Sequence, residues 1–202
     1  MITITSACTH LWAEYYGPRW LIYVAKPTTT SAILLLAWFG EGLFPFYHYA
    51  IVAGLLLSLA GDIWLMLPSD HFMAGLLSFF VAHCCYSAAF GSRLTELPSL
   101  FGLLPMLLYT ALIYHWLAPY LDPMRLPVIL YMSMITLMAW LAIAFYLQAG
   151  TWQSFFACSG AILFVLSDSA LALNRFRGSF GSAQALVLST YYGAQWFIAR
   201  SI

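Results

Sequence analysis

The sequence predicts an all-α fold, a polytopic bundle of helices embedded in a membrane. Of its 202 residues, 63% are hydrophobic and only 7% are charged, and the mean hydropathy is +0.88. A soluble globular domain carries about 25% charged residues, so this chain has too few charges to cover a water-exposed surface. Seven basic and seven acidic residues leave no net charge, which argues against a nucleic-acid partner because no basic face is available.

Eight apolar stretches are candidates for membrane spans, since a helix needs about 20 predominantly apolar residues to cross the hydrocarbon. They cover residues 2–16, 27–39, 47–67, 72–90, 101–120, 127–147, 152–173 and 183–198. The first stretch is short and polar, so the alternative is seven spans with the first stretch lying only in the interface. The connections are too short for a second domain, and residues 1–202 are expected to form a single transmembrane domain.

Prolines support these boundaries in chain order. The short second stretch starts at the sequence KPTTT, which would place Pro27 in a first helical turn, where proline is tolerated. Pro68 follows the third stretch, Pro98 follows the fourth, and Pro127 opens the sixth. The seventh and eighth stretches contain no proline. Only Pro105 is expected inside a span, near its start, so no helix should be broken at mid-membrane.

The distribution of basic residues predicts the orientation. With eight spans, one side of the membrane receives Arg19, Lys26, Arg125, Arg175 and Arg177, and the other side receives Arg93 and Arg200. Five basic residues against two place the first side in the cytoplasm and both termini outside. Loss of the first span would move only the N-terminus. The expected location is an integral position in a membrane, the inner (plasma) membrane if the chain is bacterial.

Two aspartates interrupt apolar runs and form the strongest constellation in the sequence. Asp62 lies in LSLAGDIWLML and Asp168 in FVLSDSALALN, each five residues before the end of its predicted span. Both helices should run in the same direction, so both carboxyl groups should lie roughly 8 Å below the same interface, at 1.5 Å per residue. A charge inside a span costs about 2.5–3.5 kcal/mol on insertion scales and indicates function. The alternative is two structural acids paired with basic residues.

Other polar residues are expected to line the same region. Lys26 begins the second predicted span and either snorkels to the interface, pairs with a carboxylate or holds a lipid phosphate. His83 and Tyr86 lie three residues apart on one helical face. In the last span, Tyr192 and Gln195, next to Tyr191, place phenol and amide groups on one face; the alternative for all of these is hydrogen bonding between helices.

An internal offset of 106 residues links these positions. It relates Asp62 to Asp168 and Tyr86 to Tyr192. Chance identity between apolar helices is high, but a true repeat would give a parallel duplication of four plus four helices, a pattern known in membrane proteins.

Familiar motifs for cofactors and nucleophilic catalysis are missing from the sequence. It contains no P-loop, no G-x-G-x-x-G, no G-x-S-x-G and no H-E-x-x-H. The four cysteines form no C-x-x-C pair, and zinc would need three convergent ligands. We therefore expect neither a metal nor a cofactor.

Five motifs together resemble the YhhN-like family, also called the lysoplasmalogenase family, of small eight-span membrane proteins. They are KPTTT at 26–30, GDIWLML at 61–67, FFVAHCCY at 79–86, SDSALALNRF at 167–176 and YYGAQWFIARS at 191–201. The resemblance spans nearly the whole chain and implies cleavage of the vinyl-ether bond of a lysoplasmalogen. The products would be a fatty aldehyde and glycerophosphoethanolamine or glycerophosphocholine. Asn174, in the fourth motif, joins the candidate substrate-binding residues.

The chemistry of a vinyl ether fits a pair of carboxylates. Proton transfer to carbon yields an oxocarbenium ion, which water traps as a hemiacetal that collapses to aldehyde and alcohol. This needs a general acid and a nearby anion, and glycosidases meet a related demand with two carboxylates whose environments differ. Asp62 and Asp168 are the predicted catalytic pair, with their individual roles left open. Lys26 would bind phosphate or tune a carboxylate, and the other polar residues would orient groups in the cavity.

Three alternatives remain from the sequence. The protein could hydrolyse another lysolipid, or it could be a proton-coupled transporter of lipids or small molecules, or a lipid-binding protein, since buried aspartates also suit proton coupling. A closed pocket would favour an enzyme, and a continuous pore would favour transport. The partners expected are a lysophospholipid and the bilayer, with no obligate protein partner.

Overall fold

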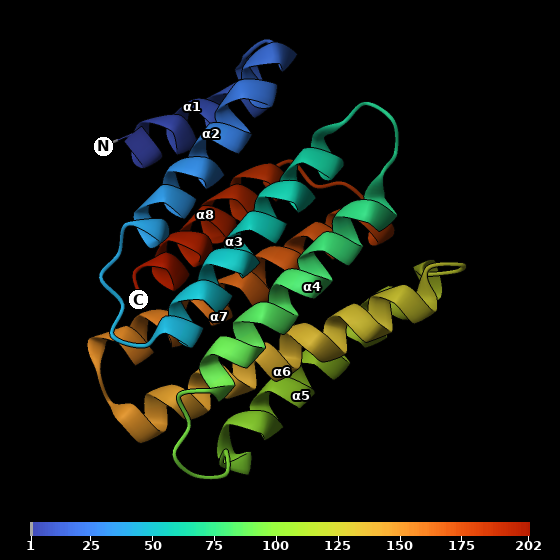
Figure 1. Ribbon diagram of the computed structural model, residues 1–202. Helices are drawn as coiled ribbons and strands as arrows, with labels where there is room; N and C mark the ends of the chain where they lie inside the picture. Colours follow the sequence, from blue (N-terminus) through green and yellow to red (C-terminus); the bar gives the residue numbers. More distant parts are fainter. Residues whose placement is uncertain (1) are drawn as a thin grey trace.

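The computed structural model describes residues 2–202 and contains, within that range, eight α-helices and no strand (Figure 1). The helices are α1 (Ile2–Tyr16), α2 (Arg19–Trp38), α3 (Pro45–Met66), α4 (Phe72–Gly91), α5 (Leu100–Leu117), α6 (Arg125–Ala149), α7 (Trp152–Ala172) and α8 (Ala183–Ala199). A 3₁₀ turn, Ala118–Tyr120, extends α5, and a π-helical turn, Leu173–Arg177, extends α7. The all-α prediction is confirmed, and seven of the eight helices lie within a few residues of their predicted bounds.

The second helix is the exception, because it begins eight residues earlier than predicted. Its N-cap is Pro18, so Pro27 lies in the helix interior rather than in the first turn. Pro27 has no N–H to donate to the Tyr23 carbonyl one turn earlier. The next two residues add side-chain hydrogen bonds to the same stretch of helix: Thr28 Oγ1 donates to the Val24 carbonyl at 2.7 Å and Thr29 Oγ1 donates to the Ala25 carbonyl at 2.8 Å. Lys26 consequently lies about 10 Å along the helix from its start, not at the membrane surface.

Six of the helices described, α2 to α7, are long and apolar enough to cross a membrane. The prediction of a polytopic membrane bundle is therefore confirmed. Helix α1 has 15 residues and α8 has 17, both shorter than the about 20 residues of a full crossing. The structure therefore supports six candidate spans, and the crossing of the membrane by α1 and α8 stays a prediction.

Close packing between helices depends on glycine at two positions. A Cβ atom at Gly54 of α3 would lie 2.2 Å from the Tyr86 ring of α4, and one at Gly160 of α7 would lie 2.7 Å from Ile198 of α8. Small residues at such positions are the usual way for membrane helices to approach closely. The hairpins α3–α4 and α7–α8 form the centre of the bundle, with α1 and α2 at one edge and α5 and α6 at the other (Figure 1).

The helix contacts follow the order that an internal repeat would produce. The contacts α1–α2, α2–α3 and α3–α4 have counterparts in α5–α6, α6–α7 and α7–α8. The two halves meet through α4 against α6 and α8 against α2, which are again equivalent pairs. The duplication itself stays a prediction, and these contacts are the ones it requires.

Candidate active site

A polar cavity opens at the end of the bundle where α3 and α7 end. Its volume is about 590 Å³, and both Asp62 and Asp168 line it together with Lys26. Further lining side chains come from the α1–α2 tip, the α3–α4 loop and α8. The two predicted aspartates therefore line one cavity at the end of the bundle where their helices end, and their equal depth below the interface stays a prediction.

Asp62 is held by three donors from two other helices. On Oδ1, Lys26 Nζ of α2 lies at 3.2 Å. On Oδ2, the hydroxyls of Thr30 (α2) and Tyr191 (α8) each donate at 2.7 Å. The Asp62 side chain is only 2% exposed, so a partly buried ion pair with added hydrogen bonds offsets the cost of taking this charge out of water.

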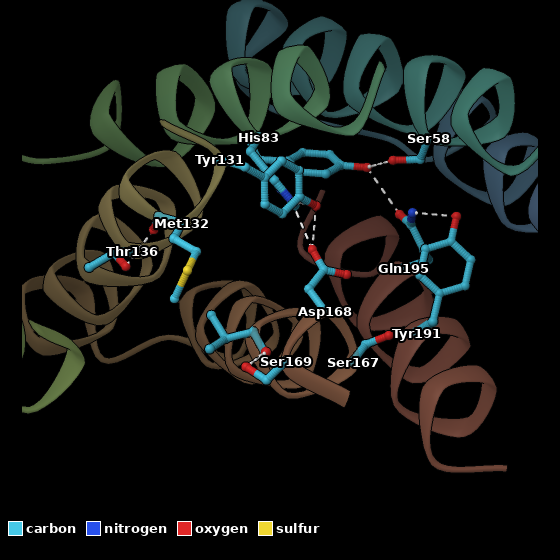
Figure 2. A network of polar contacts seen from close by, with 12 residues as sticks. Ser58, His83, Tyr131, Met132, Thr136, Ser167, Asp168, Ser169, Tyr191 and Gln195 are labelled. Atoms are coloured by element: carbon cyan, nitrogen blue, oxygen red, sulfur yellow. Dashed lines mark hydrogen bonds and ion pairs between the residues drawn. The ribbon is translucent and has the colours of Figure 1, made fainter. Parts of the chain in front are cut away.

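A chain of hydrogen bonds runs from Asp62 into the protein core. Gln195 Nε2 donates to the Tyr191 hydroxyl at 3.1 Å, and the Tyr86 hydroxyl donates to Gln195 Oε1 at 3.0 Å. Ser58 lies at the far end, 3.2 Å from the Tyr86 hydroxyl. Figure 2 shows Ser58, Gln195 and Tyr191 joined in this way. The predicted residues Tyr86 and Gln195 therefore lie on the core side of Asp62, where they orient Tyr191, and they do not line the cavity.

Asp168 has a different environment, built from α4 and α6. The Tyr131 hydroxyl donates a short hydrogen bond to Asp168 Oδ2. His83 Nε2 lies 2.9 Å from that hydroxyl and 3.4 Å from the same carboxylate oxygen. In Figure 2 these three side chains point toward one another. The His83 ring also packs edge-on against Phe164 at 4.7 Å between centroids, which fixes its plane.

A small apolar chamber adjoins the polar cavity beside Asp168. Its volume is about 70 Å³, and its walls come from α4, α5, α6 and α7. Asp168 lines both spaces, as do Leu65, Phe72 and Phe79. Asp168 thus lies at a boundary between polar and apolar surroundings, whereas Asp62 lines only the polar cavity and not the apolar chamber.

The rim of the cavity carries charged and aromatic side chains. Arg175, in the π-helical turn, bonds to Asp70 of the α3–α4 loop, and this guanidinium lowers the pKa of the Asp70 carboxyl. Beside it, the rings of Phe72 and Phe176 meet edge to face at 5.7 Å. Arg19 also lines the cavity and is exposed, and it makes no ion pair or hydrogen bond with the other side chains described.

Two more of the predicted substrate-binding residues, Tyr192 and Asn174, do not line the cavity. The Tyr192 hydroxyl is bonded to His10 Nδ1 at 2.6 Å, which fastens α1 to α8. Asn174 Oδ1 accepts from the Phe180 backbone N–H at 3.3 Å and so shapes the loop before α8. Of the six residues predicted to bind substrate, Lys26 alone lines the cavity, and His83 contacts Asp168 from behind.

Sequence reasoning missed several polar residues of the site. Tyr131 and Ser58 lie in apolar runs, where a single hydroxyl resembles an interfacial or packing residue. Thr30 belongs to the KPTTT motif, and assigning it to the buried face of α2 would have identified it as a residue of the site. His10 is fully buried in the shortest helix. Within residues 2–202, no group of three or more His, Cys, Asp or Glu side chains could hold a metal ion.

Fold and site together define an α-helical integral membrane protein with one buried and one partly buried carboxyl group in one cavity. The sequence profile of the YhhN family matches residues 21–202, and the chain belongs to that family. It is 31% identical to the protein named "Uncharacterized membrane protein YhhN" of Escherichia coli O157:H7, over 98% of this chain and 96% of the relative. It is 35% identical to "Lysoplasmalogenase TMEM86A" of Bos taurus over 95% and 82%, and 31% identical to "Lysoplasmalogenase TMEM86B" of Rattus norvegicus over 95% and 77%. No solved structure matches the chain significantly.

Proposed function

We propose that the protein is a membrane-embedded hydrolase that cleaves the vinyl-ether bond of lysoplasmalogens. The observation that carries the proposal is a polar cavity with two aspartates, beside an apolar chamber, in a chain 31–35% identical to proteins named lysoplasmalogenases. The substrate would be a lysophospholipid with one alkenyl chain. The products would be a fatty aldehyde and a glycerophospho-alcohol.

The shape of the site suits an amphiphile of this kind. A lysoplasmalogen has its vinyl-ether bond where the polar glycerophosphate meets the apolar chain. Asp168 lines both the polar cavity and the apolar chamber, so this bond would lie beside it when head and chain each occupy the matching space. The charged rim includes Arg19, which would receive the phosphate, because Lys26 is already paired with Asp62.

The residues of the site supply what the reaction needs. A carboxylic acid beside the double bond would transfer a proton to carbon, and an anion nearby would stabilise the oxocarbenium ion that forms. Water from the cavity would then add to give the hemiacetal. This water would enter from the polar cavity, which opens at the end of the bundle. We place that end at the cytoplasmic face of the membrane, because most basic residues lie there.

The packing of the bundle favours an enzyme over a transporter. Two further cavities, of about 410 and 270 Å³, lie at the opposite end, lined by residues such as Glu41 and Ile202. Between the two ends the core is filled by fully buried side chains, among them Leu55, Tyr86 and Phe164. Alternating access would have to unpack these side chains, whereas hydrolysis requires no such movement.

The direct test is aldehyde release from lysoplasmenylethanolamine by the purified protein in detergent. We expect release by the wild type and a loss of at least about 100-fold in Asp62→Asn and in Asp168→Asn, the usual size of a general acid–base contribution. The matched control is Asp122→Asn, an exposed aspartate before α6 at the same end of the bundle that does not line the cavity. It should retain full activity.

Two further substrates separate this function from its alternatives. The saturated alkyl-ether analogue has no double bond to protonate and should not react. Release of fatty acid from the matching acyl lysolipid, with no aldehyde from the vinyl ether, would instead identify a lysolipid ester hydrolase. A folded Asp168→Asn protein with full aldehyde release would refute the proposed mechanism.

A further inference from the structure

The two aspartates differ so clearly in their contacts that their tasks can be separated. We infer that Asp168 is the residue that transfers the proton, while Asp62 remains a fixed anion held by Lys26. This inference rests on the vinyl-ether hydrolysis proposed above. It goes beyond that proposal by dividing the catalytic pair into one proton-transferring carboxyl and one electrostatic group.

Asp62 is built as an acceptor. Its two oxygens receive an ammonium group and two hydroxyl donors, and its side chain is 2% exposed. An ionised carboxylate only accepts hydrogen bonds, and hydrogen bonds with charged partners are the stronger ones. Protonation of Asp62 would remove the charge that attracts Lys26 and would weaken the two hydroxyl contacts, because a neutral carboxyl group is the poorer acceptor.

Hydrogen bonds on the core side of Asp62 orient the Tyr191 hydroxyl toward the Asp62 carboxylate. The Tyr191 oxygen accepts from Gln195 Nε2, and its own hydrogen is directed to Asp62 Oδ2. Gln195 is fixed in turn because its Oε1 accepts from the Tyr86 hydroxyl. Tyr86 and Gln195 are fully buried and do not line the cavity, so their hydrogen bonds are made within the protein. The network therefore stabilises the carboxylate and not the carboxylic acid.

Asp168 has one engaged oxygen and one open oxygen. Tyr131 and His83 both lie at Oδ2, and within residues 2–202 Oδ1 has no hydrogen bond or ion pair. The Asp168 side chain is 15% exposed, compared with 2% for Asp62. A proton on Oδ1 would face the cavity without disturbing the contacts of Oδ2.

No ammonium group accompanies Asp168 in the second half of the chain. The 106-residue offset that relates Asp62 to Asp168 relates Lys26 to Met132. Met132 lines the apolar chamber together with Asp168. The ammonium group that contacts the first aspartate is thus replaced by a thioether beside the second.

The step can be written with atoms and electrons in balance. The Oδ1–H bond of Asp168 breaks, and the π electron pair of the substrate forms a C–H bond at the outer vinyl carbon. The positive charge is then shared between the inner carbon and the ether oxygen, near the Asp62 anion. Water adds to the inner carbon and gives its proton to the Asp168 carboxylate. The hemiacetal separates into aldehyde and alcohol, and Asp168 is again protonated.

Rescue by a small carboxylic acid tests this division. Aldehyde release is measured for Asp168→Gly and Asp62→Gly with added formic acid over a range of pH. We expect activity of Asp168→Gly to rise in proportion to the undissociated acid, and so to fall about tenfold per pH unit above the pKa of formic acid. Asp62→Gly should show no rescue that follows the undissociated form. Asp122→Gly serves as the control that formate must leave unchanged.

The isosteric variants decide the matter if the glycine variants do not fold. In D₂O, the residual turnover of Asp62→Asn should keep the wild-type solvent isotope effect, because the same proton transfer still limits it. The residual turnover of Asp168→Asn should differ from the wild type in its isotope effect, because its proton must come from another donor. Rescue of Asp62→Gly alone, equal rescue of both variants, or the reverse pattern of isotope effects would overturn the inference. An inactive wild type would overturn the proposed function as well, whereas an active wild type with reversed rescue would overturn only the division of roles.

Discussion

Replacing Lys26 by methionine should destabilise the protein strongly, because it leaves the Asp62 charge buried without its ion-pair partner. The two groups lie 3.2 Å apart, and their side chains are 14% and 2% exposed. Removing one partner of a buried ion pair costs about 3–5 kcal/mol. Thr30 and Tyr191 still donate to Asp62, so we expect the lower end, about 3 kcal/mol or roughly a hundredfold change in the ratio of folded to unfolded protein.

The assay is equilibrium unfolding of the purified protein by SDS titration from a mild detergent, followed by helical circular dichroism. The double variant Lys26→Met/Asp62→Asn supplies the decisive comparison. Without the negative charge, methionine is an acceptable neighbour, and the double variant should recover most of the lost stability. A single variant within about 0.5 kcal/mol of wild type, or a double variant no more stable than the single, would refute the reasoning.

Three further substitutions probe the site and the packing around it. Tyr131→Phe removes one donor to Asp168 and should lower kcat about tenfold, the value of one hydrogen bond, with KM unchanged. A change confined to KM would contradict a positioning role for Tyr131. Arg19→Ala should raise KM up to about fivefold for a phosphate-bearing substrate, as for an exposed ion pair, and leave turnover of alkenylglycerol unchanged. An equal effect on both substrates would refute phosphate contact. Gly54→Ala places a methyl group 2.2 Å from the Tyr86 ring and should cost about 1–3 kcal/mol in the same unfolding assay, where wild-type stability would disprove the tight contact.

The aspartates could be predicted because a carboxyl group in an apolar run has few explanations other than a buried polar site. Their shared end followed from counting helices, since three helices lie between α3 and α7 and these two therefore run in the same direction. Tyr131 could not be predicted in the same way, because tyrosine is common near span ends and its partner lies on another helix. The direction of each side chain depends on how α4, α6 and α7 are packed, and one sequence does not specify that.

The start of α2 was mispredicted for a similar physical reason. Proline is most common in a first turn, and Pro27 follows a lysine, which also favours a membrane boundary. The residues before it, Trp20 to Ala25, are apolar enough to continue the helix, and threonine hydroxyls bond to carbonyls beside the proline. Of the alternatives left open for Lys26, the longer helix favours pairing with a carboxylate, and Lys26 lies beside Asp62.

The hydrogen-bond chain behind Asp62 has a polarity, and that polarity connects the cavity to the architecture. Gln195 is its only member with a fixed donor end and a fixed acceptor end, so it sets the direction for the phenols of Tyr86 and Tyr191 on either side. Reversing the chain would require the amide to rotate and Tyr191 to release Asp62. A single carboxylate on α3 thus sets the direction of hydrogen bonds made by α8 and α4. Loss of that one charge would leave the chain free to reverse, while Ile198 against Gly160 and Tyr192 on His10 would still hold α8 in place.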